Sequence, residues 1–138
     1  MITALDSNIL IDIIGGDPRF GETSRAAVEM VGRQGSLVVS PEVVAEFTTG
    51  CGSIESALDA LDALRVTYVG IDLQAAGIAG QARSRSRVHR RITADYLIAA
   101  HAARHADRLL TRDADFSTLD VPGLRAVTPA QVLAASGT

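Results

Sequence analysis

The sequence predicts an α/β fold built around a mainly parallel sheet that is covered by helices on both faces. Short apolar runs alternate with helix-length segments along the chain. The runs are almost continuously apolar, which is typical of strands buried on both faces of a parallel sheet. The length of 138 residues matches one domain, and we expect residues 1–138 to form it without a linker.

Five segments have the composition of short buried strands. They are rich in leucine or β-branched residues, and Gly, Asp, Ser or Pro residues bound them. The predicted strands are residues 2–5, 37–39, 66–69, 109–111 and 124–127.

Helix-length segments lie between these runs. Apolar residues recur at the helical period, or a capping residue marks the start. The predicted helices are residues 22–33, 41–49, 53–64, 94–104 and 129–135. Ser40 followed by Pro41 is a typical helix start, and Thr93 can cap the fourth helix.

The residue types that the chain lacks exclude several kinds of site. All thirteen basic residues are arginine, which excludes the Walker phosphate loop, pyridoxal Schiff bases and other sites that need lysine. Without tryptophan, and with five Phe and Tyr residues, the chain offers few rings for stacking nucleic-acid bases. The single cysteine, Cys51, favours a reducing compartment. Since no run approaches the roughly 20 apolar residues of a membrane span, we expect a cytoplasmic protein with no membrane partner.

The two halves of the chain differ in charge. Residues 1–72 carry eleven acids and four arginines, net −7, whereas residues 73–138 carry nine arginines and five acids, net +4. This asymmetry suggests a metal-binding pocket beside a surface that attracts anions.

Acidic residues follow the predicted strands. Because carboxyl ends of parallel strands meet at one edge of a sheet, these acids should converge there. Clustered carboxylates repel one another unless a cation is present, and Mg²⁺ or Mn²⁺ with oxygen ligands is the simplest solution. The acids are Asp6, Glu46, Asp95, Asp113 and Asp115.

Four short motifs carry these acids. They are LDSN at 5–8, VVAEF at 43–47, TADYLIAA at 93–100 and LTRDADF at 110–116. In this order and spacing they resemble the PIN domain, most closely the VapC-type toxins of bacterial toxin–antitoxin pairs. The resemblance covers nearly the whole chain. It implies a five-stranded parallel sheet and an endoribonuclease activity that depends on Mg²⁺, for which Mn²⁺ can substitute. It also implies frequent homodimers and inhibition by a cognate VapB-type antitoxin.

The resemblance also assigns roles to individual residues. It places Asp6, Glu46, Asp95 and Asp113 in an acidic metal site, with Asn8 and Thr111 as polar support. Asp115 is an additional or alternative metal ligand. Either Asp113 or Asp115 is the fourth acid, and we favour Asp113 because it lies nearer the strand end.

This acid set suits the hydrolysis of phosphodiesters. The reaction needs a nucleophilic water and neutralisation of the charge that develops on the phosphate. We expect in-line attack by a water that the metal activates, with Asp6 and Asp95 as the principal ligands. Glu46 and Asp113 would complete the shell, and either could accept the proton of the water. The alternatives are another metal-dependent phosphoesterase (a DNA nuclease or a phosphatase) and a PIN-like RNA-binding protein without turnover.

An arginine-rich segment is the candidate for binding RNA phosphates. Guanidinium groups bind phosphate oxygens bidentately without reading sequence. The residues are Arg83, Arg85, Arg87, Arg90 and Arg91. A solvated charge run is the alternative, as is contact with an acidic antitoxin segment or a partner subunit.

Other acids and histidines have ordinary structural explanations. His101 and His105 have the spacing of helical zinc ligands, but no acid or thiol close in the sequence completes such a site, so we interpret them as structural. Glu42 is interpreted as a first-turn residue of its helix. The acids interpreted as parts of solvated faces or turns are Asp12, Asp59, Asp62 and Asp120.

Overall fold

A five-stranded sheet, in which every neighbouring pair of strands is parallel, forms the centre of the protein. The computed structural model describes residues 1–86 and 93–136. The strands are β1 (Thr3–Leu5), β2 (Leu37–Val39), β3 (Val66–Tyr68), β4 (Arg108–Leu110) and β5 (Ala126–Val127). Their order is β3-β2-β1-β4-β5, so the direction of winding reverses between β1 and β4. The predicted α/β fold is confirmed.

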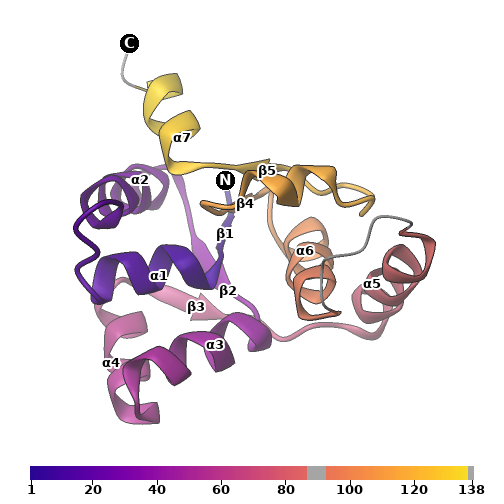
Figure 1. Ribbon diagram of the computed structural model, residues 1–138, viewed down its shortest axis with the longest axis horizontal. Coiled ribbons are helices and arrows are strands. Elements are labelled where there is room, and N and C mark those ends of the chain that lie inside the picture. The colour runs from indigo at the N-terminus through magenta and orange to yellow at the C-terminus, as the bar shows by residue number, and fades with distance from the viewer. Residues whose placement is uncertain (87–92, 137–138) are drawn as a thin grey trace.

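Helices cover both faces of this sheet. In Figure 1 the sheet lies between α1 and α2 on one side and α5 and α6 on the other. The helices of the described chain are α1 (Ser7–Ile14), α2 (Gly21–Gln34), α3 (Pro41–Cys51), α4 (Ile54–Ala63), α5 (Leu73–Arg85), α6 (Thr93–His105) and α7 (Pro129–Ser136), with a 3₁₀ helix η1 (Ala114–Thr118). None of them is long and apolar enough to cross a bilayer.

Two of these helices, α1 and α5, lie outside the segments that the sequence predicted as helical. Helix α1 follows β1 directly and buries Ile9, Leu10 and Ile13, so this apolar stretch belongs to the core. Helix α5 buries only alanines against the rest of the protein, and α6 is its main neighbour. Because the buried side chains of α5 are so small, the periodic contrast between its faces is weak.

The core depends on the three central strands. All residues of β1, β2 and β4 are buried. Large apolar side chains of the helices pack around them, including Phe47 of α3, Tyr96 of α6 and Phe116 of η1. This packing fixes the carboxyl ends of β1, β2 and β4, and the segments that follow them, relative to one another.

The central strand β4 provides a test of this core. Leu109→Ala should lower the free energy of unfolding by about 2–5 kcal/mol, because it removes a fully buried side chain and leaves a cavity. Leu73→Ala is the matched control, since the Leu73 side chain is 90% exposed. Urea denaturation followed by circular dichroism measures both. An equal effect of the two substitutions would contradict the described packing.

Candidate active site

The Asp6 carboxylate lies at the junction of β1 and α1, at the edge of the sheet where the strand order reverses. Its side chain is 4% exposed. Oδ1 accepts a hydrogen bond from the backbone N of Ser7 at 2.8 Å, which caps α1. The backbone N of Asp6 donates to the carbonyl of Leu110 at 3.0 Å and so joins the end of β1 to the end of β4. The position predicted from the strand end is therefore built into the fold.

Two polar side chains hold the second oxygen of Asp6. The Thr111 hydroxyl donates to Asp6 Oδ2 at 2.7 Å, and the Asn8 amide donates to the same oxygen at 3.3 Å. Asn8 Nδ2 also approaches Thr111 Oγ1 at 3.4 Å. Thr111 is fully buried at the end of β4. The structure thus gives Asn8 and Thr111 direct contacts with Asp6.

Glu46 and Asp95 come near Asp6 from two further elements. Ser7 Oγ donates to Glu46 Oε1 at 2.8 Å, which ties the exposed carboxylate of α3 to the start of α1. Asp95 is half-buried in the first turn of α6. The pKa of Asp6 is raised, mainly by burial and further by the negative charges of Glu46 and Asp95, although the hydrogen bonds from Thr111 and Ser7 oppose this. Three acids from three elements therefore share one electrostatic environment.

Asp113 and Asp115 differ in how they are connected to this environment. The backbone N of Asp113 donates to Thr111 Oγ1 at 3.0 Å, so Asp113 is held to the residue that contacts Asp6. Asp113 Oδ1 accepts from the backbone N of Asp115 at 3.0 Å and caps η1. The Asp115 residue itself is exposed. Asp113 is thus held next to the residue that contacts Asp6.

The acids fit a hydrated divalent ion better than a closed cage of protein ligands. Within residues 1–86 and 93–136, no three His, Cys, Asp or Glu groups are already close enough to hold one ion together. Mg²⁺ commonly keeps several waters and binds through one or two carboxylates. A cation would also relieve the cost of burying Asp6 beside two other negative charges. The donor chemistry therefore suits Mg²⁺ or Mn²⁺.

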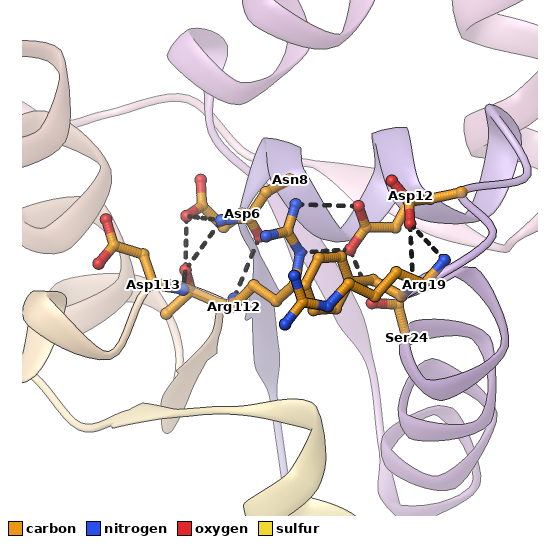
Figure 2. Close-up of polar contacts among 10 residues, drawn as sticks. Asp6, Asn8, Asp12, Arg19, Ser24, Arg112 and Asp113 are labelled. Carbon is orange, nitrogen blue, oxygen red and sulfur yellow. Dashed lines mark hydrogen bonds and ion pairs between the residues drawn. The ribbon is translucent and has the colours of Figure 1, made fainter.

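An ion pair between the buried carboxylate of Asp12 and a partly exposed arginine lies beside the acids and was not predicted from the sequence. Asp12 is 2% exposed, so its interpretation as a solvated or turn residue is wrong. Arg112 contacts it with two nitrogens: Nε lies 2.7 Å from Oδ2 and Nη2 lies 3.1 Å from Oδ1. Figure 2 shows the Arg112 side chain reaching Asp12 from the loop that also carries Asp113. The Ser24 hydroxyl donates to Asp12 Oδ2 at 3.0 Å.

Arg112 also fixes the loop that follows β4. Its backbone N donates to Asn8 Oδ1 at 3.2 Å, and its guanidinium lies over the Phe20 ring, 4.1 Å from the centroid. Its pKa is raised, first by the hydrogen bond to Asp12. Arg112 and Asp12 therefore position the loop that carries Thr111 and Asp113. The sequence did contain a signal for this ion pair. Asp12 stands within an otherwise apolar run, and an acid that is buried with such a run requires a partner.

The histidines and Glu42 have structural surroundings. His101 is 1% exposed, and its Nε2 lies 2.8 Å from the carbonyl oxygen of Val69. The pKa of His101 is lowered, mainly by burial. His105 packs against it with the ring centroids 4.9 Å apart. Glu42 lies in the first turn of α3, as predicted, and its Oε1 is buried without a hydrogen-bond partner in the described chain.

The arginine-rich segment is described only in part. Arg83 and Arg85 lie in the last turn of α5. Arg85 is exposed, whereas Arg83 is half-buried, and its Nε has no acceptor among the described residues. Arg87, Arg90 and Arg91 lie outside the described residues.

Comparison with known protein families agrees with this geometry. The family model described as "PIN domain" matches residues 3–122. The chain belongs to the PIN domain family. The matched region contains all the acids discussed above, and the resemblance seen in the sequence motifs is confirmed. A comparison with curated proteins finds no match.

Solved structures similar to this PIN domain include toxin–antitoxin complexes. VapBC2 from Rickettsia felis, bound to a DNA fragment of its promoter, is 23% identical with a TM-score of 0.70, covering 93% of this chain and 98% of that one. A toxin–antitoxin complex from Klebsiella pneumoniae is 25% identical with a TM-score of 0.69, covering 92% and 97%. VapC20 from Mycobacterium tuberculosis, a toxin that cleaves the sarcin–ricin loop, is 15% identical with a TM-score of 0.65, covering 89% and 98%.

The ion pair between Arg112 and Asp12 can be tested by stability measurements. Arg112→Met should lower the free energy of unfolding by about 1–3 kcal/mol, because the buried Asp12 carboxylate loses its cation while the 35% exposed Arg112 side chain is partly screened by solvent. The double variant Asp12→Leu/Arg112→Met should recover much of this loss, since it leaves no buried charge. Arg33→Met, at an exposed position of α2, is the control. Additive losses in a urea-denaturation double-mutant cycle would show that the pair is not coupled.

Proposed function

We propose that this PIN domain is a divalent-metal-dependent endoribonuclease and the toxin of a type II toxin–antitoxin pair, acting in the cytoplasm. The observation that carries the proposal is the buried Asp6 carboxylate, fixed by Thr111 and placed beside the charges of Glu46 and Asp95. A purely structural aspartate at a helix start would need only its capping bond. The convergence of further acids from α3 and α6 is better explained by a cation and the phosphate that it binds.

The roles of the residues follow from their attachment to the fold. Asp6 and Asp95, at the starts of α1 and α6, would be the principal ligands of Mg²⁺. Glu46 and Asp113 would complete the site directly or through water, and either could accept the proton of the attacking water. When bound, the ion supplies charge neutralisation at the phosphate and acidifies water. Asp115, which is exposed on η1, would be an additional ligand.

Support for RNA as substrate comes from the relatives and from the charge of the chain. The similar VapC20 toxin cleaves the sarcin–ricin loop, an RNA target. In this chain, Arg83 and Arg85 end α5, and the arginine-rich sequence continues to Arg91. These arginines would bind backbone phosphates and give an affinity that falls with salt.

Metal-dependent cleavage can be tested with variants of the two principal acids. Purified protein should cut structured RNA into discrete fragments with Mg²⁺ or Mn²⁺, and excess EDTA should abolish cleavage. Asp6→Asn and Asp95→Asn should each reduce the initial rate by about a hundredfold or more, because each removes a charge that positions the ion. Fragment formation on denaturing gels is the measurement.

The matched control for these variants is Asp59→Asn, which removes an exposed carboxylate of α4. It should cleave RNA at the wild-type rate, and circular dichroism should show all variants folded. RNA binding that persists in Asp6→Asn without any cleavage by the wild type would favour a binding protein without turnover. Cleavage of DNA in preference to RNA would favour the alternative phosphoesterase.

The hydrogen bond from Thr111 to Asp6 can be tested separately. Thr111→Val keeps the side-chain volume but removes the donor to Asp6 and the acceptor of the Asp113 amide. We expect a folded protein whose cleavage rate falls by about 10–100-fold, the usual effect of losing a group that orients metal ligands. Thr49→Val is the control, since within the described part of the chain its hydroxyl bonds to a carbonyl of its own helix alone. Equal rates for both variants would exclude a positioning role for Thr111.

An antitoxin and a second copy of the chain are the proposed protein partners. The similar structures from Rickettsia felis and Haemophilus influenzae are VapBC complexes. Expression of this chain alone in bacteria should arrest growth, and a small DNA-binding protein encoded beside it should relieve the arrest. Asp6→Asn expressed to the same level should be harmless. If Asp6→Asn arrested growth as strongly as the wild type, the toxicity would not depend on the acidic site.

A further inference from the structure

A second polar cavity lies at the other edge of the sheet, where β4 begins. Its volume is about 410 Å³. It is open to solvent on one side and is lined by the end of α2, the strands β4 and β5, and the helix α7. Helices α2 and α7 pack against each other in Figure 1. Its polar wall is formed by Gln34, Arg108, Arg125, Gln131 and Ser136. No acid lines it, in contrast to the site around Asp6.

Arg108 is a buried cation whose bonds lead only to neutral groups. The residue is 8% exposed. Its Nε donates to Thr3 Oγ1 at 3.0 Å, and its Nη2 donates to Gln34 Oε1 at 2.5 Å. Within residues 1–86 and 93–136, no carboxylate forms an ion pair with Arg108, and its Nη1 makes no hydrogen bond but remains accessible to solvent. A buried charge is costly unless a counter-charge is present.

The surroundings increase this excess of positive charge. Arg125 lines the same cavity from the segment that precedes β5. The pKa of Arg108 is lowered, mainly by its own burial and further by the charge of Arg125. The charge of Asp107 raises the pKa of Arg108 and so opposes these effects. However, Asp107 does not line the cavity, and its Oδ2 accepts a hydrogen bond from the backbone N of Ile2 at 2.6 Å. The cavity thus has two guanidinium groups and no internal counter-ion.

We propose that this cavity binds a phosphate group, either free or carried by a mononucleotide, between Arg108 and Arg125. A phosphate monoester carries a charge of about −1.5 to −2 at neutral pH, which balances two guanidinium groups better than one carboxylate does. Arginine forks match phosphate oxygens geometrically. The cavity volume lies in the usual range for small ligands, roughly 300–1,000 Å³. Val132 with the amides of Gln34 and Gln131 offers apolar and hydrogen-bonding contacts for a nucleoside.

This site needs no metal ion, although the smaller pocket beside Thr111 and Asp113 shares Ala126, Val127 and Gln131 with it. Arg108 is the first residue of β4, whereas Thr111 follows the last one, so the two sites occupy opposite ends of one strand. Binding at the cavity is therefore expected in EDTA, where a divalent ion cannot attract phosphate to Asp6. The inference does not depend on nuclease activity.

Amide chemical shifts provide the test. The ¹⁵N-labelled full chain is titrated in EDTA at low salt with inorganic phosphate, AMP and adenosine in separate experiments. AMP or inorganic phosphate should shift the amides of Leu109, Val132 and Ala135, and adenosine should shift them far less. Tighter binding of AMP than of inorganic phosphate would identify a nucleotide as the source of the phosphate, and the reverse order would identify the free ion.

Charge-removing variants complete the test. Arg125→Gln, at an exposed position, should weaken binding by about tenfold or more, the effect of losing a charge-assisted hydrogen bond. Arg108→Gln should do the same if it remains folded. Arg33→Gln removes an exposed charge outside the cavity and should bind like the wild type. The proposal is overturned if adenosine binds as AMP does, if Arg33→Gln weakens binding as much as Arg125→Gln, or if no ligand shifts these amides.

Discussion

Burial of the Asp6 carboxylate at the carboxyl end of β1 is the constraint around which the surrounding elements are arranged. A buried carboxylate must be hydrogen-bonded, and its donors come from the first turn of α1 and from Thr111 after β4. The same Thr111 hydroxyl accepts the amide of Asp113 and so sets the start of η1. One side chain thereby links a helix start, the end of a neighbouring strand and the loop beyond it.

The ion pair between Asp12 and Arg112 reinforces this arrangement one turn further along α1. Asn8 and Asp12 lie four residues apart on that helix, and both contact Arg112. Small displacements of α1 relative to the loop after β4 would break these bonds together, because they share one residue. Asp6 is therefore held by a hydrogen-bonded network that includes Asn8, Thr111 and Arg112, and not by packing alone.

Much of this could be predicted from local sequence. The positions of Asp6 and Asp113 after apolar strands indicated the edge of the sheet at which they lie, because strand period and turn residues are local properties. The buried state of Asp12 could not be predicted in this way, since its cation is 100 residues later in the chain. Helix α5 was missed because its buried alanines give little contrast between faces. The sequence around Arg108 does not distinguish it from other arginines beside strands. Only the fold shows that it is buried and that no carboxylate of the described chain pairs with it.

The strand order β3-β2-β1-β4-β5 also determines when the site can exist during synthesis. Asp6 is synthesised directly after β1, but the strand that completes its environment, β4, ends at Leu110 and is the fourth strand of the sheet to be made. Chains are synthesised from the N-terminus at about 5–20 residues per second, and long-range contacts form late. A nascent or truncated chain that ends before Thr111 therefore lacks both the hydroxyl that orients Asp6 and the acid that follows it. The oriented Asp6 carboxylate therefore requires a chain that extends beyond β4.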